Sequence, residues 1–159
     1  MSMGFIAISL IIQMLLICGG IHPNPGPNHD NVYCDTSICH VNIRSLRHVD
    51  TYGFHDRLMH IKSHLARKFD IITVSETWLT SSDTSDDYKI TGYQLPFRKD
   101  CTAEIGTVGY GGVLAWISDS IACKRRKDLE SPTIEAMWLE VRVANKKFFL
   151  MCYLLCTQF

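Results

Sequence analysis

The run FDIITVSETWL, residues 69–79, constrains the fold of this chain more than any other segment. It is apolar and rich in β-branched side chains, and it is interrupted by the polar pair Ser75-Glu76. Short apolar runs of this composition are typical of strands buried inside a protein. We therefore predict a buried strand that stops at Ser75-Glu76.

Patterns before this run predict a strand and a helix. Apolar and polar side chains alternate within SICHVNIRSL (37–46), as in a short strand. Apolar side chains then recur at the spacing of an amphipathic helix, at Phe54, Leu58, Ile61 and Leu65. Strand, helix and strand in this order indicate an α/β unit.

The later part of the chain predicts further strands. After an acidic, hydroxyl-rich loop at 81–87 comes a strand candidate, GGVLAWI (111–117). Residues 134–154 indicate a hairpin that turns at Asn145-Lys146. A helix-bearing first part followed by hairpins predicts a mixed α/β sandwich.

Charge and cysteine content exclude several classes of protein. The 16 basic residues equal the 16 acidic ones, so nucleic-acid binding would need a local basic patch. KRRK (124–127) is such a cluster, and it is also typical of a charged edge that keeps a hairpin soluble. The seven cysteines are odd in number and irregularly spaced, which favours buried free thiols in a reducing compartment over disulfides or a zinc site.

Residues 1–27 form an apolar segment that ends in glycines and prolines, and 28–36 are a polar linker. The apolar part, Phe5 to Ile17, is shorter than the about 20 residues that span a bilayer. It suits a signal-peptide core with a cleavage site at 18–20, although no Lys or Arg precedes it.

GGIHPNPGP (19–27) also resembles the ribosome-skipping peptides of picornaviruses and some retrotransposons, whose signature is D-[VI]-E-x-N-P-G-P. Residues 24–27 match that signature, whereas Gly20 and His22 replace its two acids. The resemblance implies a peptide bond omitted between Gly26 and Pro27.

Glu76 is the sharpest candidate for chemistry. A carboxylate at the carboxyl end of a buried strand is where open α/β sheets place ligand groups. Asn42, at the end of the preceding strand, offers a second oxygen, and Mg²⁺ prefers such ligands. From the local pattern alone, a lone Glu after a strand is more often a solvated loop residue than a functional one.

Five segments occur together in an order and spacing that are typical of one family. In chain order, they are VNIRSL (41–46), DIITVSETWL (70–79), GYGGVLAWI (109–117), EAMWLEV (135–141) and FFLMCY (148–153). They resemble the endonuclease domain of LINE-type (non-LTR) retrotransposons, within the endonuclease/exonuclease/phosphatase superfamily. The resemblance implies an α/β fold over residues 37–159, a partial four-layer α/β sandwich whose second half is missing.

The resemblance also implies roles for single residues. Asn42 and Glu76 correspond to metal-binding and catalytic residues, and Tyr153 to a tyrosine near the scissile phosphate. The implied chemistry is Mg²⁺-assisted hydrolysis of a DNA phosphodiester, with Mn²⁺ as an alternative ion, and the nick primes reverse transcription. The cations implied to contact nucleic acid are Arg44, Arg98 and Lys99.

The chain departs from the family after Tyr153, where it reads LLCTQF rather than Arg-Pro-Pro. The family's Asp-x-Asn segment and final Asp-His pair do not follow. We therefore expect half of the domain, an apolar sheet face left uncovered and no catalysis by this chain alone. The implied partners are DNA, the missing half and a downstream reverse transcriptase, and nothing indicates a homo-oligomer.

Two alternatives stay open. The chain could be a non-catalytic remnant, secreted or membrane-tethered through residues 4–20, or it could belong to another phosphoesterase branch of the superfamily. The family implies an intracellular protein that acts in the nucleus, whereas the first alternative implies the secretory pathway.

Overall fold

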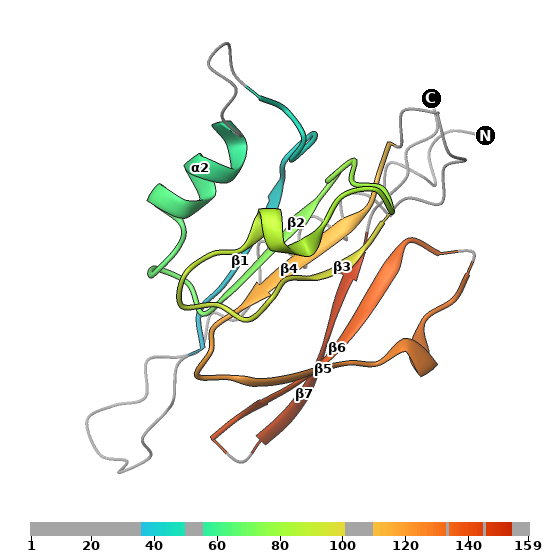
Figure 1. Cartoon of the computed structure of the whole chain (residues 1–159). Helices are drawn as coiled ribbons and strands as arrows, with labels where there is room; N and C mark the ends of the chain where they lie inside the picture. The colour runs from blue at the N-terminus through green and yellow to red at the C-terminus, as the bar shows by residue number, and fades with distance from the viewer. Residues whose placement is uncertain (1–35, 50–55, 101–109, 133, 145, 154–159) are drawn as a thin grey trace, which may run out of the picture. The chain divides into compact units, whose positions relative to one another are not determined.

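The computed structural model describes residues 36–49, 56–100, 110–132, 134–144 and 146–153 (Figure 1). The segment 1–27, with the predicted skipping site, and the linker up to residue 35 lie outside the described residues. Within the described ranges, no helix is long and apolar enough to cross a membrane.

The first sheet has four strands in the order β1-β2-β4-β3. Its parallel pair, β1 (Ile38–Asn42) and β2 (Ile71–Ser75), is joined through helix α2 (Asp56–His64). Strands β3 (Phe97–Lys99) and β4 (Val113–Ile117) run antiparallel to their neighbours. The strand–helix–strand prediction for this part of the chain is confirmed, and a short 3₁₀ helix, η1 (Ser85–Tyr88), lies in the predicted acidic loop.

The second sheet is an antiparallel meander of β5 (Ala122–Arg125), β6 (Ala136–Val143) and β7 (Lys146–Tyr153). A short 3₁₀ helix, η2 (Lys127–Leu129), connects β5 to the segment before β6. The predicted hairpin over 134–154 is therefore confirmed as β6–β7. Its tip passes from Ala144, at a φ of +46°, to Lys146, and Asn145 is outside the described part.

One hydrophobic core lies between the first sheet and helix α2. Leu58 and Ile61, two of the predicted stripe residues, are buried there, and Leu65 is half-buried after the helix ends. They pack in one cluster with the apolar side chains on this face of β2 and β4, which are Ile72, Val74, Leu114 and Trp116. The apolar stripe of α2 therefore packs on this face of the first sheet.

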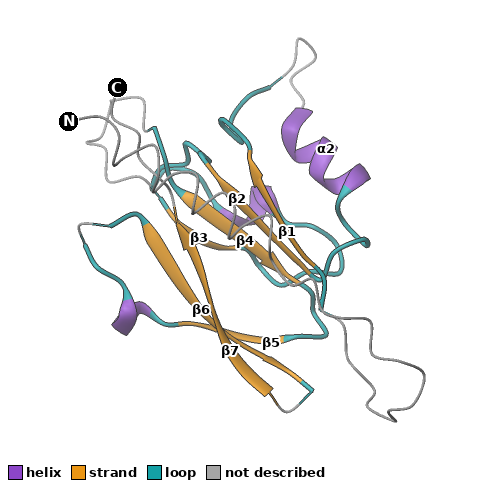
Figure 2. Cartoon of the chain, turned by 180° about the vertical axis from the view of Figure 1, so that it is seen from behind, coloured by secondary structure: helices purple, strands orange, loops and turns teal. Residues whose placement is uncertain are grey.

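A second core lies between the two sheets, on the other face of β2 and β4 (Figures 1 and 2). Alternate residues of β6, Met137, Leu139 and Val141, are fully buried in it. They pack against Ile71, Val113, Ala115 and Ile117 of the first sheet. Because both of its faces are covered, all five residues of β2 are buried, as its composition predicts.

The expectation of an uncovered apolar face is wrong for the first sheet. The β5–β7 meander packs on it, so the described residues contain two sheets that face each other. The described residues form three layers, a helix and two sheets, and the four-layer arrangement stays a prediction. The described cysteines, Cys39, Cys123 and Cys152, are free thiols as predicted, and burial raises the pKa of Cys152 to about 12.

Candidate functional site

Asn42 and Glu76 lie at the carboxyl ends of neighbouring parallel strands. Asn42 is paired directly opposite Ser75, the residue before Glu76. The loop after β1 continues this pairing, because the backbone N–H of Ser45 donates to the Glu76 carbonyl at 2.6 Å and that of Leu46 to Thr77 at 2.9 Å. The two predicted ligand residues are thus brought together at one edge of the first sheet.

The backbone around Glu76 adopts a left-handed conformation. Glu76 has a φ of +59° and Trp78 a φ of +56°, a region that residues other than glycine enter at a cost of order 1–3 kcal/mol. Two hydrogen bonds to the residues just before β4 hold the backbone in this conformation. The backbone N–H of Thr77 donates to the Gly112 carbonyl at 3.3 Å, and that of Trp78 donates to the Gly111 carbonyl at 2.8 Å. Strain of this kind, held by the surrounding structure, is concentrated at functional sites.

The side chain of Glu76 is oriented by an aromatic neighbour. Trp78 donates from its indole Nε1 to Oε2 of Glu76 at 2.8 Å. The indole in turn meets the ring of Tyr110 edge-on, with ring centroids 5.0 Å apart. Tyr110 is 65% exposed, so an aromatic pair stands beside the carboxylate at the surface. Sequence reasoning missed both residues, although Trp78 lies within the SETWL motif.

His40 is a second functional candidate that sequence reasoning missed. It lies on the same face of β1 as Asn42, and its Nδ1 is 2.9 Å from Thr73 Oγ1 and its Nε2 3.4 Å from Ser75 Oγ. Because the Thr73 hydroxyl donates to the carbonyl of Cys39 at 3.2 Å, it accepts from the imidazole Nδ1–H. Desolvation lowers the pKa of His40, which favours the neutral ring.

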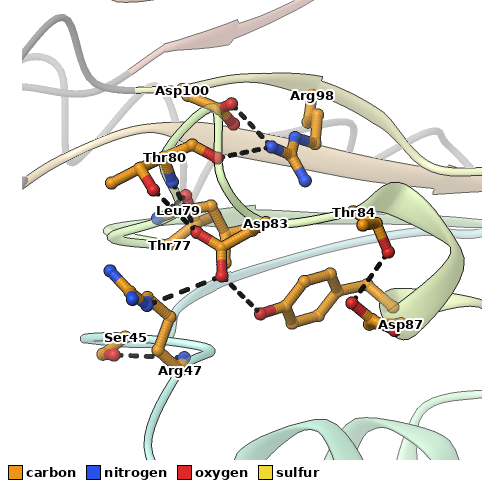
Figure 3. A network of polar contacts seen from close by, with 11 residues as sticks. Ser45, Arg47, Thr77, Leu79, Thr80, Asp83, Thr84, Asp87, Arg98 and Asp100 are labelled. Atoms are coloured by element: carbon orange, nitrogen blue, oxygen red, sulfur yellow. Dashed lines mark hydrogen bonds and ion pairs between the residues drawn. The ribbon is translucent and has the colours of Figure 1, made fainter. Parts of the chain in front are cut away.

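The loop that follows Glu76 is anchored by Asp83 (Figure 3). Its carboxylate accepts from the backbone N–H of Thr80 at 2.8 Å, from the Thr80 hydroxyl at 3.0 Å and from the Tyr88 hydroxyl at 3.3 Å. Arg47, from the loop after β1, forms an ion pair with it at 3.5 Å. Burial and the neighbouring Asp83 raise the pKa of Tyr88 to about 12. The acidic loop therefore helps to fix the position of the segment that follows Glu76.

The predicted nucleic-acid cations lie in different surroundings. Arg98 is only 12% exposed, and it binds Asp100 and the Thr80 carbonyl, each at 2.7 Å. The ammonium group of Lys99 donates to three backbone carbonyls, those of Ser131, Ile134 and Ala136. Both side chains stabilise the protein in these positions, and their contact with DNA stays a prediction.

Arg44 and Tyr153 are the remaining predicted site residues. Arg44 is exposed two residues after Asn42 and has a φ of +49°. Tyr153 is half-buried at the end of β7, paired opposite Ala136. Glu135, next to Ala136, accepts from the Gly112 N–H at 3.2 Å, which links this end of the second sheet to the strand entry beside Glu76.

The side-chain oxygens of Asn42 and Glu76 are of the type that binds a hard cation, but two residues supply few of the ligands that such an ion needs. Carboxylate and amide oxygens are ligands of Mg²⁺ and Mn²⁺. Among the described side chains, no group of three or more His, Cys, Asp or Glu could hold a metal ion. The two residues could therefore hold Mg²⁺ only if water and substrate phosphate complete its shell, which is the usual way that Mg²⁺ is bound.

The sequence matches no family model and no curated protein. Among solved structures, the chain is similar to AP endonuclease LMAP from Leishmania major, with a TM-score of 0.51 and 16% sequence identity. The similarity covers 75% of this chain and 40% of that one, so the chain spans less than half the length of the enzyme. At this identity the likeness concerns the fold alone: this chain has a mixed α/β, two-sheet fold similar to that of an AP endonuclease.

Proposed function

We propose that this chain is part of a divalent-metal-dependent DNA endonuclease encoded by a non-LTR retrotransposon. The observation that carries the proposal is the position of Asn42 and Glu76, side by side at the carboxyl ends of the parallel strands β1 and β2. The AP-endonuclease-like fold supports a phosphoesterase activity. The five segments that resemble retrotransposon endonucleases support the origin and the substrate.

In this proposal, Glu76 and Asn42 hold Mg²⁺ or Mn²⁺. When bound there, such an ion would neutralise negative charge on the phosphate oxygens of DNA. Trp78 keeps the Glu76 carboxylate oriented, and the loop bonds of Ser45 and Leu46 keep Asn42 beside it. Tyr153 lies near the scissile phosphate. The groups that hold the attacking water and orient the base belong to the family's later Asp-x-Asn and Asp-His motifs, which do not follow Tyr153 in this sequence.

A non-catalytic remnant is the second candidate, because the described residues supply only this small ligand set. We also propose ribosome skipping at Gly26-Pro27 or, as the alternative, secretion through residues 4–20. Both segments lie outside the described part of the chain. Action in the nucleus is a further proposal, which follows from the family resemblance.

A binding measurement that needs no turnover tests the metal site. Mn²⁺ broadens NMR signals of nearby nuclei, so we expect the backbone amide signals of Asn42, Ser75 and Glu76 to broaden first as Mn²⁺ is added. Glu76→Gln should abolish this, whereas Asp119→Asn, an exposed carboxylate elsewhere, should not. Broadening that spares these amides would overturn the proposal of a metal site.

A nicking assay on supercoiled plasmid with Mg²⁺ or Mn²⁺ then tests the reaction. We expect no nicking by this chain alone, and Glu76-dependent nicking by a longer chain that carries the later family motifs. If the longer chain binds Mn²⁺ at Glu76 but does not nick DNA, the remnant hypothesis is favoured.

A further inference from the structure

We propose that Glu135 is a positioning residue of the candidate metal site, which acts on Glu76 through one peptide group and Trp78. Glu135 directly precedes β6 in the second sheet, whereas Glu76 directly follows β2 in the first. Because this role concerns the orientation of Glu76, it rests on the proposed function. Glu135 opens the segment EAMWLEV, but sequence reasoning gave it no role.

The peptide group between Gly111 and Gly112 joins Glu135 to Trp78. Its N–H, which belongs to Gly112, donates to Oε2 of Glu135 at 3.2 Å. Its carbonyl, which belongs to Gly111, accepts the backbone N–H of Trp78 at 2.8 Å. A trans peptide directs its N–H and its C=O to opposite sides, so a single planar group bridges the two residues. One side of this group faces the second sheet, and the other faces the turn that contains Glu76.

The backbone conformation of the two glycines permits this bridge. Gly111 has a φ of +108° and Gly112 a φ of +81°, values that glycine adopts without the steric cost of a side chain. The carbonyl of Gly112 also accepts the backbone N–H of Thr77, at 3.3 Å. The glycine pair therefore presents two successive carbonyls to the turn after Glu76, while the amide between them is held by Glu135.

The negative charge of Glu135 strengthens the contacts that follow it. A hydrogen bond to an ionised acceptor is stronger than one between neutral groups, and a peptide whose N–H is held in this way is a better acceptor at its carbonyl. The Gly111 carbonyl accepts the Trp78 N–H and also the Thr77 hydroxyl, at 3.5 Å. The charge therefore stabilises the left-handed turn from which the Trp78 indole donates to Glu76 at 2.8 Å.

Glu135 is itself held from both sides. The backbone N–H of Ala136 donates to the Ile134 carbonyl at 2.8 Å, which closes a three-residue turn centred on Glu135. Lys99, whose side chain is only 16% exposed, donates from its ammonium group to the Ile134 carbonyl at 2.9 Å and to the Ala136 carbonyl at 3.1 Å. These bonds fix the backbone before and after Glu135, so its carboxylate is already placed to accept from Gly112.

Amide NMR of the full chain without metal tests the bridge. Glu135→Gln keeps the size of the side chain and an acceptor oxygen but removes the charge. We expect the backbone amide protons of Gly112 and Trp78 to move upfield in this variant, because their hydrogen bonds weaken. The indole N–H signal of Trp78, whose acceptor is Glu76, should shift with them. Unmoved Gly112, or a change there that does not reach the Trp78 signals, would overturn the proposal whether or not the chain binds metal.

A double-mutant cycle tests whether Glu135 acts on the metal site through Trp78. Mn²⁺ affinity is followed by broadening of the Asn42, Ser75 and Glu76 amides. Glu135→Gln should weaken binding about fivefold, less than the about tenfold expected for Trp78→Phe, because it acts one step further from Glu76. Trp78→Phe/Glu135→Gln should bind no more weakly than Trp78→Phe, since residues that act through one another are not additive. Losses that multiply would show an independent action of Glu135 and contradict the relay.

The matched control is Glu140→Gln, which makes the same change within β6. The Glu140 carboxylate pairs with Arg126 at 2.8 Å and with Arg142 at 3.1 Å, away from the glycine pair. Its loss should leave the Trp78 signals and the Mn²⁺ affinity unchanged. Equal weakening by Glu140→Gln and Glu135→Gln would reveal a general effect of charge or stability, and the positioning role would be wrong. If the unmodified chain shows no Glu76-dependent Mn²⁺ binding, the proposed function fails, and the metal-free signals still decide whether Glu135 orients Glu76.

Discussion

The indole Nε1 of Trp78 and Oε2 of Glu76 are 2.8 Å apart, joined by a hydrogen bond between two side chains only two positions apart in the chain. In an extended strand, residues two apart point to the same side but their side chains do not turn toward each other. Here both residues have a positive φ, and the intervening Thr77 is buried. The turn therefore brings the indole onto the carboxylate.

Trp78→Phe should lower the affinity of the candidate site for Mn²⁺ by about tenfold. Loss of a residue that hydrogen-bonds to a metal-binding side chain and orients it typically lowers metal affinity about 10–100-fold. Mn²⁺ titration followed by amide broadening measures it. Trp138→Phe removes another indole far along the chain and should leave the affinity unchanged. Equal affinities of Trp78→Phe and the unmodified chain would show that the bond does not position Glu76.

Asp83→Asn should lower the free energy of unfolding by about 1–3 kcal/mol, because Asp83 accepts bonds from Thr80 and Tyr88 and pairs with Arg47. Its side chain is 13% exposed, so water replaces these bonds poorly. Urea unfolding measures the change. Asp87→Asn is the control, since exposed Asp87 accepts one bond from Thr84 at 2.7 Å, and we expect it to cost less than about 0.5 kcal/mol. Equal losses in the two variants would contradict the assignment of Asp83 as an anchor.

Glu130 should make stability depend on pH. Its hydrogen-bonded ion pair with Arg125, at 2.7 Å for both bonds, lowers the pKa of the Glu130 carboxyl below 4.5. A carboxyl whose pKa is lower in the folded state stabilises the fold above the unfolded pKa, and this contribution disappears as pH falls through the folded pKa. At pH 6, we expect the free energy of unfolding of the unmodified protein to be about 2 kcal/mol higher than that of Glu130→Gln.

That difference should shrink steadily in urea unfolding curves recorded at pH 6, 5, 4 and 3. Asp119→Asn, which removes an exposed carboxylate, controls for the change in net charge. A difference that stays constant or grows on acidification would contradict the proposed role of the Arg125 pair.

Met137→Ala should cost about 2–5 kcal/mol of unfolding free energy, because the side chain is fully buried between the two sheets and its removal leaves a cavity. Met59→Ala makes the same chemical change on helix α2, where the side chain is 53% exposed, and should cost less than about 1 kcal/mol. Similar costs at the two positions would show that the sheets do not pack as described.

The elements of this fold could be predicted from the sequence because their signals are local. The apolar run before Ser75 became β2, the stripe through Leu58 and Ile61 became the buried face of α2, and the alternation in 134–154 became β6 and β7. The pairing of Asn42 with the end of β2 was also foreseeable, since carboxyl ends of parallel strands meet at one edge of a sheet.

Only the tertiary structure decided which faces meet. Local periodicity marks an apolar face but does not identify the face on which it packs. The sequence therefore predicted a mixed α/β sandwich without showing that the second sheet packs on β2 and β4. The contact of His40 with Thr73 spans 33 positions, and the bond of Lys99 to the Ser131 carbonyl spans 32. Such contacts depend on how the chain folds back on itself. The sequence by itself therefore determined the two candidate ligands, helix α2 and strands β1, β2, β4, β6 and β7, but not β3 or β5. Long-range packing decided the surroundings of all of them.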